Sequence, residues 1–460
     1  MRIVLLLMLC CSFANINAQN TKNEPIKSPT FSVEALQEDF SQWRNRVEKK
    51  HPLIYFYHSK KEIDATFDSS YASIQTPMTE IDFFRLLSFV TTKINDGHNF
   101  INPSSNVIQE ILKSDKLLPL DIQLLDNKLF ITNNLSTIDL PKIGNQIHTI
   151  NGVSASNLIK EMLAIIPSDA YTPYSKSIFS QYFRFYYHIC FGLNKDYLIS
   201  YQDADEVKKI NLTGSTLKEI RSRNKYSTKE KCIQFKMIDS LKTAILTLST
   251  FSDEAIKKDC GLKFKKVIQA HFETIQNTNT AHLILDLRNN NGGNPASVKF
   301  VLKRLMNQTF QQNVECRVVK HPNEEDFWKR TTKRWYPAYG LGKIRPVKNP
   351  YKGKIYVLIN EGTFSAGVDL AYALKKYSEA TFIGQETGGN PIIMGGYLLK
   401  TSWELSNTKI QVSPATLCTL SDDLDKNKGR GLLPDYVIEH SFSDSGNIDK
   451  YIDFTLDLIK

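Results

Sequence analysis

A serine and a pair of adjacent glycines stand at turns that follow two apolar segments of the chain. The first segment, LILDLRNNNGG, ends at Gly292 and Gly293, and the second, KIYVLINEGTFS, ends at Ser365. Acyl transfer needs a nucleophilic hydroxyl and backbone N–H groups that hold the developing oxyanion. Ser365 could be the nucleophile, and the N–H groups of Ala366 and of Gly292 or Gly293 could be the oxyanion donors. The sequence therefore indicates a candidate hydrolytic site.

Each of these residues also has a common structural role. A serine at the start of a helix is a frequent N-cap, because its hydroxyl accepts a hydrogen bond from the first helical turn. Adjacent glycines are frequent where a turn requires a positive φ. The local pattern fits both the structural and the catalytic roles.

The two turns belong to a region in which strands and helices alternate. From about residue 242 onward, strand-length apolar runs (TAILTLS, HLILDLR, KIYVLIN and ATFIG) precede segments with apolar residues at helical spacing. This alternation predicts a mostly parallel sheet covered by helices. Two β-like runs around a turn at Asn407 and a C-terminal helix follow. A strand that ends at a Gly-rich turn and leads into a helix exposes N–H groups at the helix start.

The N-terminal region has a helical pattern. From Ser32 to about Asn95, apolar residues recur at spacings of three and four, which predicts several helices. Thr79 and Asp82 resemble a capping box at the start of the last of them. That helix leads directly into Asp96, Gly97 and His98, written DGH below.

The region from about residue 118 to residue 214 is richer in β pattern. It predicts a hairpin that turns at Asp126-Asn127 and a tight turn at Asn151-Gly152. An aromatic-rich segment from Ser168 to Phe191 is expected to be helical and to precede another strand. We therefore expect a β-rich module with a helical insertion.

Several motifs occur in a fixed order along the chain: DGH, DLRNN-GG, GTFSAG, IGQETGG and GRGLLPDY. This collinear set resembles the tail-specific (C-terminal-processing) protease superfamily of serine peptidases, and its tricorn-core and interphotoreceptor-retinoid-binding-protein branch. The resemblance implies a crotonase-like α/β core. It also implies a PDZ-like module, to which the segment GNQIHTINGVSA, beginning at Gly144, is similar.

The resemblance assigns roles to individual positions. Ser365 matches the nucleophile, the Ala366 N–H one oxyanion donor, and the Gly292-Gly293 turn the other. The bacterial processing branch uses a lysine as base, but Asn390 stands at that place, so a Ser–Lys dyad is not supported. The tricorn-like branch uses a histidine from the N-terminal part, and His98 matches it. An imidazole with a pKa near 6.5 suits a base at neutral pH, although a loop histidine can also merely cap a helix end.

The residue that would orient the histidine stays open. Tricorn-like members carry a glutamate just before the G-x-x-P-D motif, where this chain has other residues. Two basic residues fill the matching places and three carboxylates precede them: Lys428, Arg430, Asp422, Asp423 and Asp425. Asp369 would share a helix face with Ser365, and Asp96 lies beside His98 in sequence. Each of these carboxylates alone could equally be an ordinary surface or capping group.

Composition and charge bound the function. The 460 residues exceed one compact domain, and an apolar content of 41% with 23% charged residues is that of a globular protein. The net charge of +10 comes from dispersed basic residues, which indicates solubility rather than nucleic-acid binding. Residues 1–18 resemble a signal peptide, with an apolar core from Ile3 to Leu9 that is too short to span a bilayer. We therefore expect export to the periplasm or the extracellular space, without stable membrane insertion.

The cysteines are scattered. Removal of the signal peptide leaves an odd number, with no pair at metal-ligand spacing: Cys190, Cys232, Cys260, Cys316 and Cys418. An odd number cannot pair completely within one chain, so we expect buried free thiols and no disulfide framework.

These observations lead to one architecture and one function. We expect an α/β protein with a signal peptide (1–18), a leader and helical domain (19–115), a PDZ-like domain with a helical insertion (116–214) and a peptidase core (215–460). It is predicted to be an exported serine-type endopeptidase that cleaves extended or unfolded polypeptides without a metal or organic cofactor. The alternative is a non-catalytic carrier of peptides or lipids on the same scaffold.

Overall fold

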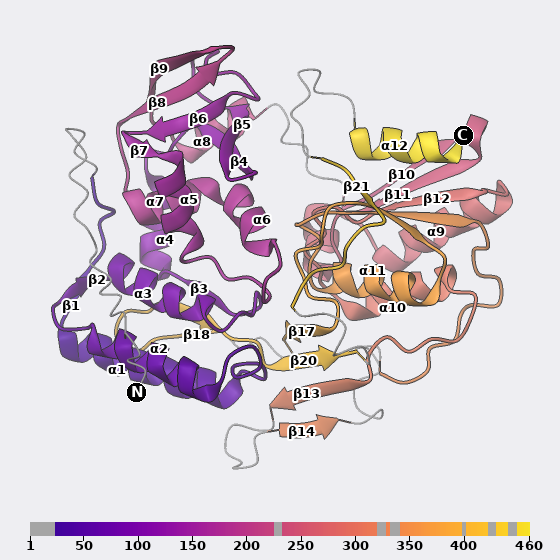
Figure 1. Cartoon of the computed structure of the whole chain (residues 1–460), viewed down its shortest axis with the longest axis horizontal. Helices are drawn as coiled ribbons and strands as arrows, with labels where there is room; N and C mark the ends of the chain where they lie inside the picture. Colours follow the sequence, from indigo (N-terminus) through magenta and orange to yellow (C-terminus); the bar gives the residue numbers. More distant parts are fainter. Residues whose placement is uncertain are drawn as a thin grey trace, which may run out of the picture.

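The computed structural model describes residues 24–224, 232–319, 328–331, 341–397, 402–421, 429–439 and 449–460 (Figure 1). The expected signal peptide lies outside these residues. The fold is a mixed α/β structure with several sheets, in which strands and helices cover one another. None of the helices within the described ranges has the length and apolarity needed to cross a bilayer.

The N-terminal region is helical, as its apolar spacing predicts. Ser32, Ser59 and Thr79 each accept a hydrogen bond from a backbone N–H three residues later, so the three long helices begin at these caps. Their apolar faces form one core, with Trp43 and Phe84 among its buried members. The elements are β1 (Thr30–Phe31), α1 (Val33–Lys50), α2 (Lys60–Ala72), β2 (Met78–Thr79), α3 (Glu80–Thr92), β3 (Phe100–Asn102) and α4 (Ser105–Lys113).

The next region is a β-rich module covered by helices. Its first hairpin turns at Asp126 (φ 46°) and Asn127 (φ 58°), and two consecutive positive φ angles are what a tight two-residue hairpin requires. The predicted helical insertion forms α6 and α7, which pack on the sheet. The elements are β4 (Leu120–Leu125), β5 (Lys128–Asn134), β6 (Gln146–Ile150), β7 (Val153–Ser154), α5 (Ala155–Leu163), α6 (Tyr174–Gln181), α7 (Phe183–Phe191), β8 (Asp196–Asp203), β9 (Glu206–Thr213) and α8 (Leu217–Arg223).

The C-terminal half is built on a twisted sheet in the order β10-β11-β12-β15-β16-β21. From β11 to β21 neighbouring strands are parallel, as the alternation of strands and helices predicts, and β10 is antiparallel to β11. Helices α9, α10 and α11 lie against this sheet, and α12 covers its other side (Figure 1). The elements are β10 (Ile233–Ile238), β11 (Thr243–Leu248), α9 (Phe264–Asn277), β12 (His282–Asp286), α10 (Pro295–Leu305), β15 (Lys354–Ile359), α11 (Ala366–Tyr377), β16 (Thr381–Gly384), β21 (Tyr436–Val437) and α12 (Lys450–Ile459).

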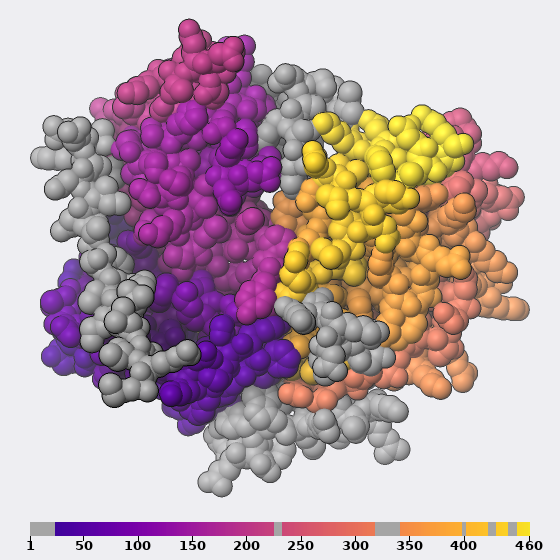
Figure 2. Space-filling view, in the orientation of Figure 1, coloured from indigo at the N-terminus to yellow at the C-terminus, as the bar shows by residue number. Residues whose placement is uncertain are grey.

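Two smaller sheets are built from strands of the C-terminal half, and one of them also includes a strand of the N-terminal region. One has the order β14-β13-β20-β17 and the other the order β18-β19-β3, so that strand β3 of the N-terminal region pairs with a strand from far along the chain. Residues of the segment 403–413 join the N-terminal core. On the face shown in Figure 2, the yellow and orange surface of the C-terminal half adjoins the magenta surface of the β-rich module. The strands are β13 (Glu315–Val319), β14 (Trp328–Thr331), β17 (Ile393–Gly396), β18 (Trp403–Glu404), β19 (Gln411–Ser413) and β20 (Leu417–Leu420).

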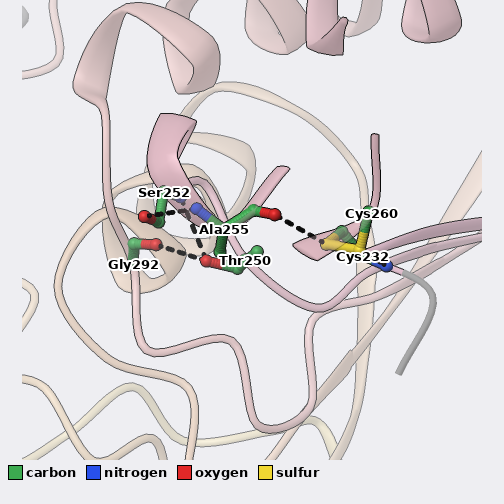
Figure 3. Close-up of a disulfide and its surroundings, with 6 residues drawn as sticks. All are labelled: Cys232, Thr250, Ser252, Ala255, Cys260 and Gly292. Carbon is green, nitrogen blue, oxygen red and sulfur yellow. Dashed lines mark hydrogen bonds between the residues drawn. A yellow bond between two sulfur atoms is a disulfide. The ribbon is translucent and has the colours of Figure 1, made fainter. Parts of the chain in front are cut away.

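The expectation of free thiols is wrong for two cysteines. Cys232 and Cys260 form a disulfide (Figure 3), whereas no disulfide involves Cys190, Cys316 or Cys418 within the described residues. The odd number excludes complete pairing but not a single pair. Sequence spacing does not reveal this pair because the turn after β11 folds back to bring position 260 beside the start of β10.

Candidate active site

The two turns that the sequence singled out lie at one edge of the parallel sheet. Strands β12 and β15 are direct neighbours in parallel register, so their carboxyl ends and the turns that follow are adjacent. Thr363 Oγ1 donates a hydrogen bond to the Leu287 carbonyl at 2.8 Å, and the Phe364 N–H donates to the Asn290 carbonyl at 2.9 Å. These bonds fix one turn against the other.

Ser365 has a strained backbone at the start of α11. Its φ of 50° and ψ of −127° are unfavourable for a residue with a β-carbon, and its side chain makes no capping hydrogen bond to the helix. The structural role of an N-cap is therefore not the one this serine has. The strained conformation leaves the hydroxyl directed away from the helix and available for another partner.

His98 is that partner. Its Nε2 lies 3.0 Å from Ser365 Oγ, a hydrogen-bonding distance. The ring is buried and stacks on Phe364, with ring centroids 4.5 Å apart. The Tyr397 hydroxyl donates a hydrogen bond to the His98 carbonyl. Strand β3 begins two residues after His98 and pairs with β19, so the position of the histidine depends on a strand from far along the chain.

The two glycines of the first turn differ in whether their N–H groups already donate a hydrogen bond. The Gly292 N–H donates to Asn290 Oδ1 at 2.9 Å, so it is already engaged. Gly293 has a φ of 136°, and its α-carbon packs on the Phe251 backbone. Among the described residues we find no acceptor for the N–H of Gly293 or of Ala366. Of the two alternatives from the sequence, Gly293 is the one with an available donor.

Two buried carboxylates face the other ring nitrogen of His98. Asp96 Oδ1 lies 3.5 Å from His98 Nδ1, and Asp169 Oδ1 lies 3.9 Å from it. Asp96 also accepts the His98 backbone N–H at 2.8 Å, and Asp169 accepts the Gly97 N–H at 2.6 Å. The distances to Nδ1 are those of ion pairs rather than of tight hydrogen bonds.

Asp169 escaped the sequence analysis. It lies in the loop before α6, in the β-rich module, and no motif marks it. The Ala170 N–H donates to the Asn95 carbonyl at 2.9 Å, which places this loop against DGH. An isolated acid among small and aromatic residues after an apolar run was the only signal that the sequence offered.

His51 also escaped the sequence analysis. It is completely buried at the end of α1, and its Nε2 lies 3.0 Å from Asp96 Oδ2. Pro52 follows it, and a residue before proline prefers an extended conformation, so the helix ends here. The ring therefore projects from the end of the helix toward DGH.

Burial and mutual attraction shift the pKa values of this cluster. Burial alone would raise the pKa of Asp96, but hydrogen bonding and attraction to His51 and His98 hold it well below its usual range. Burial raises the pKa of Asp169 to about 7, and repulsion by Asp96 adds to this shift. For His98, burial opposes the charged form, but Asp96 and Asp169 outweigh it and raise the pKa. Asp96 is therefore the carboxylate that stays ionised beside the imidazole.

Among the other residues considered from the sequence, Asp369 acts on the imidazole through its charge, which helps to raise the pKa of His98. Asp369 is one helical turn from Ser365, but none of the ion pairs within the described ranges joins it to His98. Asn390 donates to the Tyr57 hydroxyl at 3.0 Å and accepts the Ile392 N–H at 2.9 Å. Arg430 pairs with Glu386. The remaining candidates lie outside the described residues: Asp422, Asp423, Asp425 and Lys428.

A cavity of about 770 Å³ opens beside Ser365. Its wall is mostly apolar and aromatic, with Tyr174, Ile178 and Met394 among the lining residues. Asp369 contributes a carboxyl group to this wall, and burial raises its pKa to about 7. The cavity therefore has a mostly apolar wall with one carboxyl group, that of Asp369, near the Ser365 hydroxyl.

Asp96, His98 and Asp169 are close enough to one another for a metal ion to be considered, since their donor atoms lie within 4.8 Å. Each carboxylate already accepts a backbone N–H, and the imidazole faces Ser365 through its other nitrogen. The three residues therefore already have polar partners in one another, in two backbone N–H groups and in Ser365.

A series of hydrogen bonds runs from the turn at Gly292 toward the Cys232–Cys260 disulfide (Figure 3). Ala255 N–H donates to Ser252 Oγ at 3.3 Å, and Thr250 Oγ1 donates to the Gly292 carbonyl at 3.3 Å. The Ser252 N–H donates to Thr250 Oγ1 at 3.0 Å and joins the two contacts. The Cys260 N–H donates to the Ala255 carbonyl at 3.2 Å, and this bond ties the turn that carries the candidate oxyanion donor to the Cys232–Cys260 disulfide.

Comparison with known proteins agrees with this arrangement. Residues 242–438 match the model of Peptidase family S41. The structure of mature CPAF in complex with lactacystin is similar over 93% of this chain and 98% of that chain, with 14% identity and a TM-score of 0.66. Mature CPAF is similar over 88% and 92%, with 14% identity and a TM-score of 0.64. At this identity the similarity concerns the fold. Residues 242–438 are thus similar to Peptidase family S41, and this match, the fold and the order of the motifs support the resemblance to the tail-specific (C-terminal-processing) protease superfamily of serine peptidases.

Proposed function

We propose that the protein is an exported serine endopeptidase that hydrolyses extended or unfolded polypeptides through an acyl-enzyme on Ser365. The observation that carries the proposal is the 3.0 Å contact between His98 Nε2 and a serine hydroxyl held in a strained turn. A nucleophile and a base at this distance meet the geometric requirement for proton transfer. The available N–H groups of Gly293 and Ala366 add the means to stabilise an oxyanion.

The reaction then has two halves. His98 Nε2 takes the proton of Ser365 Oγ as the oxygen attacks the scissile carbonyl carbon, and the oxyanion lies against the Gly293 and Ala366 N–H groups. The imidazolium gives its proton to the leaving amine, which leaves an ester on the serine. Water then attacks the ester with His98 as base, and the acid product departs.

Asp96 is proposed as the acid that orients His98 and stabilises the imidazolium. It is the ionised carboxylate nearer to Nδ1, whereas Asp169 has a raised pKa. The loose 3.5 Å distance is expected to shorten when the imidazole becomes charged. Asp369 is proposed to contact substrate rather than His98, because it lies in the cavity wall.

The scaffold supports the finer points of this proposal. We propose that the β11–β16 sheet with its helices is the crotonase-like core, and that the β4–β9 region is a PDZ-like module that could bind an extended peptide. Export is proposed from the sequence of residues 1–18. A disulfide between Cys232 and Cys260 is the kind of bond that persists in an oxidising compartment.

The rival function is a carrier, and the apolar cavity of about 770 Å³ favours it. A carrier, however, has no use for a strained serine in contact with a buried imidazole. Mature CPAF, which shares this fold, forms a complex with lactacystin. Lactacystin is therefore a suitable probe of the present serine.

Active-site labelling decides between the two functions. A fluorophosphonate and lactacystin are each incubated with the mature protein, and the adduct is located by mass spectrometry. We expect labelling at Ser365, loss of labelling in Ser365→Ala and His98→Ala, and normal labelling in the control Ser378→Ala at the other end of α11. Failure of both probes to label the folded wild-type protein would support the carrier.

A further inference from the structure

We propose that His51 is a positioning residue that holds the Asp96 carboxylate in its ionised, His98-facing state, so that His51, Asp96, His98 and Ser365 act as one row. This inference rests on the proposed peptidase function. Three contacts define the row: His51 Nε2 to Asp96 Oδ2 at 3.0 Å, Asp96 Oδ1 to His98 Nδ1 at 3.5 Å, and His98 Nε2 to Ser365 Oγ at 3.0 Å.

The tautomer of His51 follows from its second contact. The Leu53 backbone N–H donates to His51 Nδ1 at 3.1 Å, so Nδ1 is an acceptor and carries no hydrogen. In a neutral imidazole the single ring hydrogen is then on Nε2, the atom that lies next to Asp96. His51 can therefore donate to the carboxylate without carrying a charge of its own.

The position of Asp96 makes this donor valuable. Its carboxylate is buried, and on one side it packs against Gly395, where an added β-carbon would lie 2.5 Å from Oδ2. Among the described residues, its polar partners are the His98 N–H, the His98 ring and His51. A buried carboxylate that loses a hydrogen-bond donor becomes harder to ionise. A second acid, Asp169, lies close enough to Asp96 to be the ionised group instead. We infer that the contact with His51 makes Asp96, and not Asp169, the ionised carboxylate.

The other titratable groups around the cluster do not replace His51. They come from several elements and loops: Tyr57, Asp169, Tyr174, Asp369, Tyr397 and Cys418. Burial raises the pKa of each of the three tyrosines, and it raises that of Cys418 to about 12. These groups stay neutral at neutral pH, and the two further carboxyl groups are acids.

The direction of the expected pH effect follows from the charge on Asp96. Without the donor on Oδ2, Asp96 is harder to ionise, and less negative charge acts through Oδ1 on His98 Nδ1. The imidazolium is then favoured less, and the pKa of His98 falls. Since only neutral His98 can accept the serine proton, the fall of the Ser365 labelling rate toward low pH (the acid limb) moves to lower pH.

The substitutions His51→Asn and His51→Gln distinguish the contact of His51 with the Leu53 N–H from its contact with Asp96. Asparagine can keep the contact to the Leu53 N–H, because its amide oxygen takes the place of Nδ1, but it cannot reach Asp96. Glutamine can extend its amide N–H to the place of Nε2. The rate of fluorophosphonate labelling of Ser365 is measured for both across pH 5 to 9, with thermal unfolding as a check on the fold.

His188 offers a matched control. It is also completely buried, its Nε2 accepts the Leu118 N–H at 3.3 Å, and its Nδ1 lies 2.9 Å from the Gly192 carbonyl. None of its contacts within the described residues involves His51, Asp96, His98 or Ser365. His188→Asn and His188→Gln remove the same ring volume, so they report what the loss of packing does by itself.

We expect His51→Asn to slow labelling about 10- to 100-fold, the loss that a misplaced group typically causes, and to move the acid limb to lower pH. His51→Gln is expected to label within a few-fold of wild type with an unmoved limb. The His188 variants should lower the unfolding temperature only. Equal rates and limbs in wild type and His51→Asn would overturn the inference, as would equal slowing by His51→Asn and His188→Asn. Failure of the wild-type protein to label would instead refute the proposed function.

Discussion

Gly292 lies so close to Ser365 that a β-carbon at position 292 would stand 2.6 Å from the serine β-carbon and 2.8 Å from the Ala366 nitrogen. The candidate nucleophile, one candidate oxyanion donor and the first turn therefore share a single tight contact. Real side chains do not approach this closely, so any larger residue must displace one of the three.

Gly292→Ala is predicted to slow labelling of Ser365 by at least about 100-fold, because the displacement moves the serine against its base and the oxyanion donors. The measurement is the rate of fluorophosphonate labelling. Gly152→Ala is the matched control, since Gly152 also has a positive φ (78°) but would meet nothing within 4 Å. Similar slowing in both variants would mean that backbone strain, and not the contact with Ser365, is the cause.

Asp96→Asn is predicted to lower the maximal labelling rate by roughly 10²- to 10⁴-fold and to move the acid limb to lower pH. The sign follows from the charge: Asp96 raises the pKa of His98, and its removal lets that pKa fall. Neutral His98 then persists to lower pH. A limb that stays in place or moves upward would contradict the role of Asp96.

Asp169→Asn is predicted to move the same limb less than Asp96→Asn does. The pKa of Asp169 is raised to about 7, so near neutral pH this group carries only part of a charge. Its influence on His98 is therefore weaker than that of the fully ionised Asp96. The pH–rate profiles of the two variants give the comparison. A larger shift in Asp169→Asn would mean that Asp169, and not Asp96, is the acid that orients His98.

Reduction of the Cys232–Cys260 disulfide is predicted to destabilise the fold and to slow labelling. The bond closes a sequence separation of 28 residues, and loss of such a bond typically costs about 2–4 kcal/mol. It also anchors the hydrogen-bonded row that ends at the Gly292 carbonyl. Thermal unfolding and labelling are measured with and without reductant.

The control for the disulfide uses a free thiol. Cys190→Ala should respond to reductant as the wild type does, while Cys232→Ala/Cys260→Ala should be insensitive to it. A reduced protein that labels at the oxidised rate would show that the row does not transmit the loss of the bond to the turn.

Asp369 is predicted to give the cavity a pH-dependent preference for cationic side chains. Its pKa of about 7 means that the carboxyl becomes charged as the pH rises through neutrality. Peptides with lysine should then be cleaved faster than peptides with norleucine by up to about fivefold above pH 8, the size of a partly exposed ion pair. The preference should vanish below pH 6 and in Asp369→Asn. A preference that persists in this variant would place the cation elsewhere.

The sequence was informative where a local pattern carries the structure. Alternating apolar runs predicted the parallel sheet, and capping residues such as Thr79 predicted the helix starts. The order of the motifs pointed to Ser365 and His98, which the structure holds 3.0 Å apart. Each of these signals lies within a few residues of the feature that it predicts.

The missed features all depend on contacts between distant segments. Asp169 and His51 reach the site from loops of other regions, and nothing near them in sequence marks that approach. The choice between Gly292 and Gly293 depends on the direction of a single N–H, which is set by the Asn290 side chain. The disulfide likewise depends on how the turn after β11 folds back.

The pairing of β3 with β19 has a consequence for biosynthesis. The register joins Phe100 to Ser413 and Asn102 to Gln411, so the strand that follows His98 finds this partner only after residues 411–413 have been synthesised. A nascent chain that stops before Gln411 would hold its imidazole on a loop that lacks this pairing. The contact between Ser365 and His98 is therefore expected to become fixed late in synthesis.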